Sequence, residues 1–251
     1  MENIKGLAHD NLRFLDLNEY PGRGIVVGMD LSGLNFIQAY WIQGRSPSSR
    51  NRVFEQGDNG VVRTSAANRT IDMGDTSLIF YRAMAERHGM YVVSNGDQTD
   101  TIIEYDHDGH SFFQALRTRQ YEPDGPNFTP RISAACFLRK SGPSAEISIL
   151  KRSLFGEATD RDLYRYEQFE SGYGYCVHTY MGDGDPLPSF EGRPYLIPLA
   201  GGGIDDIAEN LWSALDSPHM VSLVVKQIDV STGKSAIHIK NKYEVVETAA
   251  A

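Results

Sequence analysis

Three short polar segments of this sequence carry side chains that can bind an anion or move a proton. The first lies between Gly44 and Arg52 and directly follows an apolar stretch. It holds three arginines and three serines within eight residues, and their guanidinium, hydroxyl and backbone N–H groups can all donate to a phosphate or a carboxylate. The candidate binding residues are Arg45, Ser46, Ser49, Arg50, Asn51 and Arg52. A solvated serine-rich loop has the same composition, but a basic loop behind an apolar strand in an acidic protein favours anion binding.

The second segment runs from Ser94 to Thr101 and follows the apolar residues 90–93. Asn95-Gly96 is a turn signal, and Asp97 or Thr99 is a suitable N-cap for a short helix. A turn and one cap leave the other short polar side chains of the segment unexplained. We therefore consider Asp97 and Asp100 as general bases or as acceptors for ligand hydroxyl groups. The residues expected to line a pocket beside them are Ser94, Asn95, Gly96 and Thr99.

The third segment is 127–132, in which Arg131 opens an apolar strand directly after Thr129-Pro130. An arginine at a strand end can simply be exposed, whereas one behind a rigid Thr-Pro step can point into a site. Two other polar patterns are weaker. The glycine run 201–203 is followed by two aspartates that would oppose an anion, so we expect a flexible connection there. Segment 106–110 contains aspartates and histidines, but their spacing matches no zinc or calcium motif, and no metal site is expected.

Charge and composition limit the partners of the chain. Its formal net charge is −9 at pH 7, which disfavours nucleic acid and anionic membranes, although a few arginines in a cleft can still bind a small anion. The two cysteines, Cys136 and Cys176, lie far apart and form no CxxC pair, as expected for reduced thiols. The first residues contain no apolar core of signal-peptide length, and no apolar run of the sequence is long enough to span a bilayer, so we expect neither a signal peptide nor a membrane span. We therefore expect a soluble, cytoplasmic protein.

The elements that must position these residues are mostly strands. A helical stripe of apolar residues is expected over Ile204–Leu215, and shorter helices over 8–16 and Ser111–Arg119. Strands are expected over Gly24–Met29, Phe36–Ile42, 60–64, 78–84, 90–94, Arg131–Leu138, Glu146–Lys151, Tyr173–Tyr180, His219–Gln227 and Ser235–Ile239. Many strands without a regular βαβ alternation predict an α+β fold, a sheet sandwich covered by helices. We expect residues 1–251 to form one domain, with a frayed tail after about residue 244.

The polar segments occur in an order that resembles a known family. Tyr20-Pro-Gly-Arg23-Gly precedes the first strand, Arg50-Asn51-Arg52 ends the basic loop, and the two later segments read Val93-Ser-Asn-Gly-Asp-Gln-Thr-Asp-Thr101 and Thr129-Pro-Arg-Ile-Ser-Ala134. Together they resemble the IMP cyclohydrolase family, the archaeal PurO type and its longer bacterial homologues. The resemblance covers residues 20–135. The C-terminal half, including 172–176 and 180–194, is more divergent and is similar to the longer bacterial members.

The resemblance implies an αββα sandwich of two stacked, mainly antiparallel sheets, like that of the N-terminal-nucleophile hydrolases. Members of that fold class use a Cys, Ser or Thr at the mature N-terminus, but Met1 is followed here by Glu2. The family fold is therefore expected without the covalent mechanism. The implied reaction closes 5-formamidoimidazole-4-carboxamide ribonucleotide (FAICAR) to IMP in purine biosynthesis. This chemistry requires no metal, cofactor or covalent intermediate, and its only expected partner is a purine nucleotide. Self-association into a homo-oligomer stays open.

Roles follow from the resemblance as hypotheses. The basic loop would bind the 5′-phosphate, and the second segment would line the base and ribose pocket, with Asp97 or Asp100 accepting the carboxamide proton. Arg131 or Arg23 would stabilise the formyl oxyanion, and Tyr20 or Tyr173 would relay a proton during water loss. Thr129 is a further binding candidate. Two alternatives remain: a purine-nucleotide-binding protein that has lost the chemistry, and a hydrolase of linear amides on the same fold.

Overall fold

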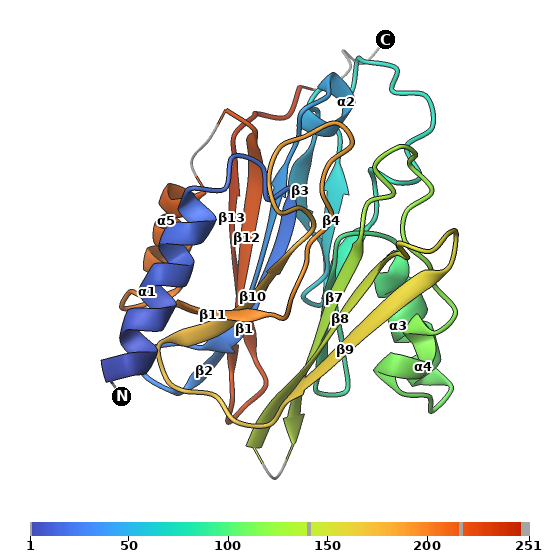
Figure 1. Cartoon of the computed structure of the whole chain (residues 1–251). Coiled ribbons are helices and arrows are strands. Elements are labelled where there is room, and N and C mark those ends of the chain that lie inside the picture. The colour runs from blue at the N-terminus through green and yellow to red at the C-terminus, as the bar shows by residue number, and fades with distance from the viewer. Residues whose placement is uncertain (1, 140–141, 216–217, 247–251) are drawn as a thin grey trace.

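The computed structural model describes residues 2–139, 142–215 and 218–246, and its centre consists of two antiparallel sheets stacked face to face (Figure 1). The first sheet has the strand order β11-β10-β1-β2-β12-β13 and the second has the order β3-β4-β5-β6-β7-β8-β9. The strands of the first sheet are β1 (Arg23–Met29), β2 (Asn35–Gln43), β10 (Tyr173–His178), β11 (Tyr195–Pro198), β12 (Met220–Asp229) and β13 (Ser235–Asn241). Those of the second are β3 (Val53–Gln56), β4 (Val62–Ser65), β5 (Arg82–Arg87), β6 (Met90–Ser94), β7 (Arg131–Arg139), β8 (Gly142–Arg152) and β9 (Thr159–Tyr166).

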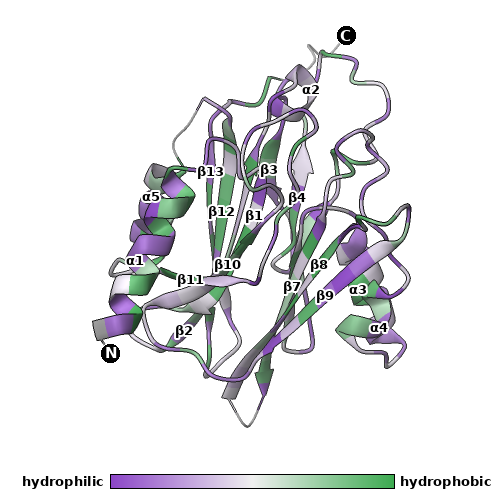
Figure 2. Ribbon diagram, viewed as in Figure 1, coloured by the Kyte–Doolittle hydropathy of each residue, from purple (hydrophilic) through white to green (hydrophobic). Residues whose placement is uncertain are grey.

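Side-chain alternation along the central strands explains the layers. In β2, Phe36, Tyr40 and Ile42 belong to the core between the two sheets, whereas Ile37 and Trp41 face the opposite side. Because both faces of this strand are covered, β2 is apolar on both faces rather than alternating with polar residues. Figure 2 shows the same concentration of hydrophobic residues along the central strands, such as β12 and β8.

Helices cover the outer face of each sheet (Figure 1). The helices are α1 (Glu2–Asp16), α2 (Pro47–Arg50), α3 (Gln98–His107), α4 (Phe112–Leu116) and α5 (Ile204–Ala214). Leu15 of α1 and Leu211 of α5 pack on the first sheet, and Ile102 of α3 and Leu116 of α4 pack on the second. Each such leucine or isoleucine contributes about 1.5–3 kcal/mol when fully buried. The expected α+β fold with two stacked antiparallel sheets is thereby confirmed.

Several element predictions need correction. The strand expected over 78–84 begins later, because Ile79 and Phe80 both bond back to Thr76 in a turn and β5 starts only at Arg82. The helix expected over 8–16 already begins at Glu2. The short helix expected behind Asp97 or Thr99 is α3, in which Asp97 holds the N-cap position but its side chain makes no cap hydrogen bond. Strands β3, β9 and β11 were not predicted as elements. Residues 140 and 141 of the expected hairpin turn lie outside the described residues. In the C-terminal tail, the backbone N–H of Val246 donates to Ala67.

The strand register brings distant segments to one end of the sandwich. Arg23 at the start of β1 pairs with Ile42 near the end of β2, and the next residue, Gly24, pairs with His178 at the end of β10. The loops that follow β2 and β10 therefore meet the segment that precedes β1. Gly22 in that segment has a φ of +73°, and a Cβ there would lie 2.4 Å from Thr179 Oγ1, so only glycine fits the turn. This convergence creates the cavity described below.

Two further observations concern the described part of the chain as a whole. None of its helices is long and apolar enough to cross a membrane. Cys136 and Cys176 are both free and buried, one in each sheet.

Candidate active site

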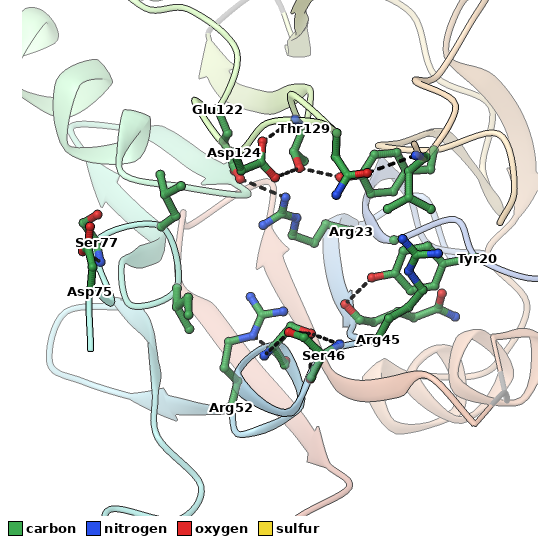
Figure 3. Close-up of a pocket in the computed structure, with 18 residues that line it drawn as sticks. Tyr20, Arg23, Arg45, Ser46, Arg52, Asp75, Ser77, Glu122, Asp124 and Thr129 are labelled. Atoms are coloured by element: carbon green, nitrogen blue, oxygen red, sulfur yellow. Dashed lines mark hydrogen bonds and ion pairs between the residues drawn. The ribbon is translucent and has the colours of Figure 1, made fainter. Parts of the chain in front are cut away.

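A cavity of about 410 Å³ opens at this end of the sandwich (Figure 3). Its walls come from the segment before β1, the loop after β2, the loop between β4 and β5, the loop before β7 and the loop after β10. The lining residues are Tyr20, Gly22, Arg23, Gln43, Arg45, Ser46, Ser49, Arg52, Asp75, Ser77, Leu78, Ile79, Glu122, Asp124, Asn127, Thr129, Tyr180 and Leu187. The volume is within the range of small-ligand pockets, and its lining is unusually rich in charged side chains.

A buried ion pair forms one wall of the cavity. Arg23 Nη2 donates to Glu122 Oε2 at 3.1 Å, and the two side chains are only 11% and 3% exposed. The other carboxyl oxygen, Glu122 Oε1, is buried and has no hydrogen-bond partner among the described residues. Burial raises the pKa of Glu122, and Arg23 and Arg131 only partly oppose this effect. A raised pKa makes this carboxyl group a better proton acceptor than a solvated one, and its unpaired oxygen can exchange a proton with a ligand.

Arg52 contributes a second buried guanidinium (Figure 3). Its Nε donates to the backbone oxygen of Ser49 at 2.8 Å, but no carboxylate of the described residues forms an ion pair with it. Burial lowers the pKa of Arg52, and the charge of nearby Arg23 lowers it further. Charged groups are rarely buried without a counter-charge. An anionic ligand in the cavity would supply the one that is missing here.

Two tyrosines and an arginine form a further part of the cavity wall. The rings of Tyr20 and Tyr180 stack with centroids 5.8 Å apart, and the guanidinium of Arg45 lies 5.3 Å from the centroid of Tyr20. Arg45 Nη1 also donates to Asp183 at 2.5 Å and to the backbone oxygen of Gly184 at 2.9 Å. Arg45 is thus paired with a carboxylate at the rim, whereas Arg52 inside the cavity forms no ion pair with a carboxylate of the described residues.

The basic loop is divided between the cavity and the fold. Arg45, Ser46, Ser49 and Arg52 line the cavity. Ser46 and Ser49 also cap helix α2 reciprocally, since each hydroxyl accepts the other residue's backbone N–H. Arg50 and Asn51 point elsewhere: Arg50 Nε donates to the backbone of Gly44 at 3.0 Å, and Asn51 Nδ2 donates to that of Asn68 at 3.0 Å.

The second polar segment lies behind the cavity wall and is absent from its lining. Asn95 is buried and bonds to both Pro130 and Ile132, which fixes the start of β7. Ser94 bonds to Ser133 within the sheet, Gly96 is packed against Arg131, and Thr99 is buried in the first turn of α3. Tyr173 lies at the other end of β10, opposite Pro198.

The acidic and basic candidates behind the wall form ion pairs with one another. Arg131 Nη1 donates to Asp97 at 2.7 Å, and Arg119 donates to the same carboxylate oxygen. Burial opposes the ionisation of Asp97, but the two arginines outweigh it and lower its pKa. Asp100 pairs with Arg82 at 2.5 Å. Arg131 is close enough to Glu122 to oppose its protonation, so this network adjoins the cavity without lining it.

Sequence reasoning missed several polar residues of the cavity, among them Glu122, Asp124 and Tyr180. Asp124 accepts from the backbone N–H of Thr129 at 2.7 Å and from its hydroxyl, and that hydroxyl is also bonded to Tyr180. Glu122 and Asp124 flank a proline just before the Thr129-Pro130-Arg131 motif. This pair of acidic residues, directly before the motif, was the sequence feature that could have indicated the carboxylates of the cavity.

Comparison with known proteins identifies one family. Residues 20–234 match the family model described as IMP cyclohydrolase-like protein. No curated protein matches the chain. Within the described residues, no group of three or more histidine, cysteine, aspartate or glutamate side chains is arranged to hold a metal ion.

Proposed function

Because this chain belongs to the IMP cyclohydrolase-like protein family, we propose that it is an enzyme that closes FAICAR to IMP with loss of water. Family membership supports a role in purine biosynthesis. The observation that carries the finer proposal is the cavity, which combines an unpaired, buried Arg52 with the buried Arg23–Glu122 pair. The first suits a phosphate, and the second suits proton transfer at a developing oxyanion.

The proposed reaction sets the requirements for the site. The carboxamide nitrogen of the substrate bonds to the formyl carbon, and the formyl oxygen leaves as water. Two protons leave nitrogen atoms and two protons reach the departing oxygen, so the site must both accept and donate protons. Since both reacting groups belong to one molecule, holding them in line supplies much of the rate enhancement. The chemistry involves no change of oxidation state.

In this proposal Arg52 binds the 5′-phosphate of the nucleotide. A guanidinium can donate two parallel hydrogen bonds to a phosphate, and its Nε is already held by Ser49. The hydroxyl groups of Ser46 and Ser49 are close by in the same wall. Arg45, above the Tyr20 ring at the rim, adds positive charge at the entrance. Arg50 and Asn51 would support the loop rather than touch the ligand.

Glu122 and Arg23 are proposed to act at the formyl group. Arg23 would stabilise the negative charge that develops on the formyl oxygen, because a buried guanidinium is worth more there than in water. Glu122, whose pKa is raised by burial, would donate the proton that this oxygen needs. Asp97 and Arg131, which do not line the cavity, would act on Glu122 through the charge of Arg131. Tyr20 would line the cavity without taking part in proton transfer. This assignment moves the catalytic carboxyl group from the second polar segment to the loop before β7.

We also propose that the sandwich shares its architecture with the N-terminal-nucleophile hydrolases without using their covalent chemistry. The stacked antiparallel sheets between helices support this proposal. The cavity described above contains no cysteine, and both cysteines of the chain are buried in strands.

The test is an assay of the purified protein with FAICAR, in which IMP formation is followed by absorbance while the melting temperature is measured with and without IMP. Turnover together with stabilisation by IMP is the expected result. Stabilisation by IMP without turnover would favour a purine-nucleotide-binding protein that lacks the reaction. The absence of both would contradict the proposal.

A further inference from the structure

Three side chains on the cavity wall form a continuous hydrogen-bonded chain. The hydroxyl of Thr129 bonds on one side to Asp124 Oδ2 and on the other side to the phenolic oxygen of Tyr180. All three residues line the cavity, yet Thr129 and Tyr180 are only 1% and 4% exposed. The hydrogen-bonded series thus runs from the cavity surface to the carboxylate of Asp124. This carboxylate also accepts a second hydrogen bond, from the backbone N–H of Thr129 to Asp124 Oδ1 at 2.7 Å.

The donor order of this chain follows from counting protons. A carboxylate only accepts, and a threonine hydroxyl has a single proton, so Thr129 donates to Asp124 and must accept from Tyr180. The phenolic proton of Tyr180 is therefore directed at Thr129, which leaves a lone pair of the phenolic oxygen free to accept from a ligand. Burial raises the pKa of Tyr180 to about 12, although Arg23 opposes this, so the phenol keeps its proton near neutral pH.

On the basis of the proposed function, we propose that Tyr180, Thr129 and Asp124 are a proton relay that removes the carboxamide proton of the substrate during ring closure. The nitrogen lone pair forms the new N–C bond, and the C=O electron pair moves to the formyl oxygen. The nitrogen's proton passes to the Tyr180 oxygen, the Tyr180 proton to Thr129, and the Thr129 proton to Asp124. Asp124 ends protonated, and both hydroxyl groups end neutral. No phenolate forms at any stage.

The placement of Tyr180 does not depend on its hydroxyl group. Its ring stacks on Tyr20, its backbone N–H donates to Pro21, and its backbone oxygen accepts from Asn18. The bond to Thr129 therefore adds little to the positioning of the ring. Glu122 and Asp124, two residues apart, have contrasting surroundings: one carboxyl has an unpaired buried oxygen, and the other accepts two bonds from Thr129. Such a contrast separates a proton donor from a proton acceptor.

The experiment compares Thr129→Val, Thr129→Ser and Tyr180→Phe in the FAICAR assay. Valine has the shape of threonine but lacks its hydroxyl group, and serine keeps the hydroxyl group. We expect kcat to fall about 100-fold or more in Thr129→Val and Tyr180→Phe, in line with the loss of general-base catalysis, with KM within about threefold of wild type. Thr129→Ser should recover most of kcat. In wild type, the rate in mixtures of H₂O and D₂O should depend on deuterium content with the curvature of several protons in flight, and this curvature should be lost in Tyr180→Phe.

Wild-type kcat in Thr129→Val, or equal losses in Thr129→Val and Thr129→Ser, would overturn the relay while leaving the proposed function intact. An absence of turnover in the wild-type protein would overturn both. Stabilisation by IMP identifies variants that are folded. Should Thr129→Val fail to fold, Tyr180→Phe and its isotope dependence decide the question, because the ring of Tyr180 is held by contacts that the substitution keeps.

Discussion

Replacing Arg52 should make the ligand-free protein more stable and its ligand binding weaker. The guanidinium is buried, donates a hydrogen bond through Nε to the backbone oxygen of Ser49, and lies near the like charge of Arg23. Burying an ion costs several kcal/mol after relaxation, whereas one hydrogen bond returns about 1 kcal/mol. Methionine keeps the length and the apolar stem of the side chain. We expect Arg52→Met to raise the free energy of unfolding by about 1 kcal/mol, and Tm by roughly 2–4 °C for a chain of this size.

The same substitution removes the donors that we assign to the phosphate. Hydrogen bonds to charged groups contribute about 1.5–3 kcal/mol, and 1.4 kcal/mol corresponds to a tenfold change in affinity. The Kd for IMP should therefore rise about 10- to 100-fold. Urea denaturation without ligand gives the stability, and calorimetric titration with IMP gives the affinity. Higher stability together with weaker IMP binding distinguishes a ligand-binding arginine from a structural one, whose loss would lower stability.

Arg87→Met is the matched control, because Arg87 is 30% exposed on β5 and pairs with Asp106 at 3.6 Å, outside the cavity lining. It should change stability by no more than about 1 kcal/mol and leave IMP binding unchanged. The reasoning about Arg52 is refuted if Arg52→Met lowers the free energy of unfolding and binds IMP as tightly as wild type.

Three further predictions concern the fold. Gly24→Ala should lower the free energy of unfolding in urea by about 3 kcal/mol or more, because its Cβ would lie 1.9 Å from the Trp41 ring. Gly6→Ala in α1 meets nothing within 4 Å and should raise the free energy of unfolding by up to about 1 kcal/mol. Equal effects of the two substitutions would contradict this reasoning. Burial lowers the pKa of His178 from 6.5 to about 4. The stability that the neutral imidazole contributes above pH 6.5 should therefore be lost as the pH falls towards 4, by about 3 kcal/mol. A His178→Leu variant whose stability falls equally steeply with pH would show that His178 is not the cause. Lys226→Met removes a fully buried ammonium group from the partly exposed carboxylate of Glu86, which keeps its hydrogen bond from Ser235. The substitution should cost about 1.5 kcal/mol, and an unchanged urea midpoint would show that the ion pair contributes nothing.

The sequence predicted those elements in which local pattern and tertiary burial agree. Helix α5 carries an apolar stripe at helical spacing, and its buried residues Ile207, Ala208 and Leu211 lie on that stripe. Strand β9 was missed because it is an edge strand whose side chains are mostly partly or fully exposed, and Asp160, Arg161 and Asp162 give it the composition of a loop. Its assignment depends on pairing with β8, which is not a local property.

The cavity was predictable only in part for the same reason. Tyr20, Arg23 and Arg52 lie next to strand ends and carry chemistry that a local reading can recognise. Which loops share one end of the sandwich depends on the pairing of β1 with β2 and β10, so Tyr180, more than 150 residues after Arg23, could not be placed beside it. The aspartates of the second segment have the right chemistry, but their arginine partners come from other elements.

The central claim is that the catalytic carboxyl group is the buried one in this cavity. The most direct measurement compares kcat for FAICAR in Glu122→Gln and Asp97→Asn, both of which replace a carboxylate by an amide of the same shape. We predict that Glu122→Gln loses about 100-fold or more in kcat, with IMP binding retained, and that Asp97→Asn stays within about tenfold of wild type because its carboxylate acts only through Arg131. Wild-type turnover in Glu122→Gln, or a larger loss in Asp97→Asn, would contradict the account.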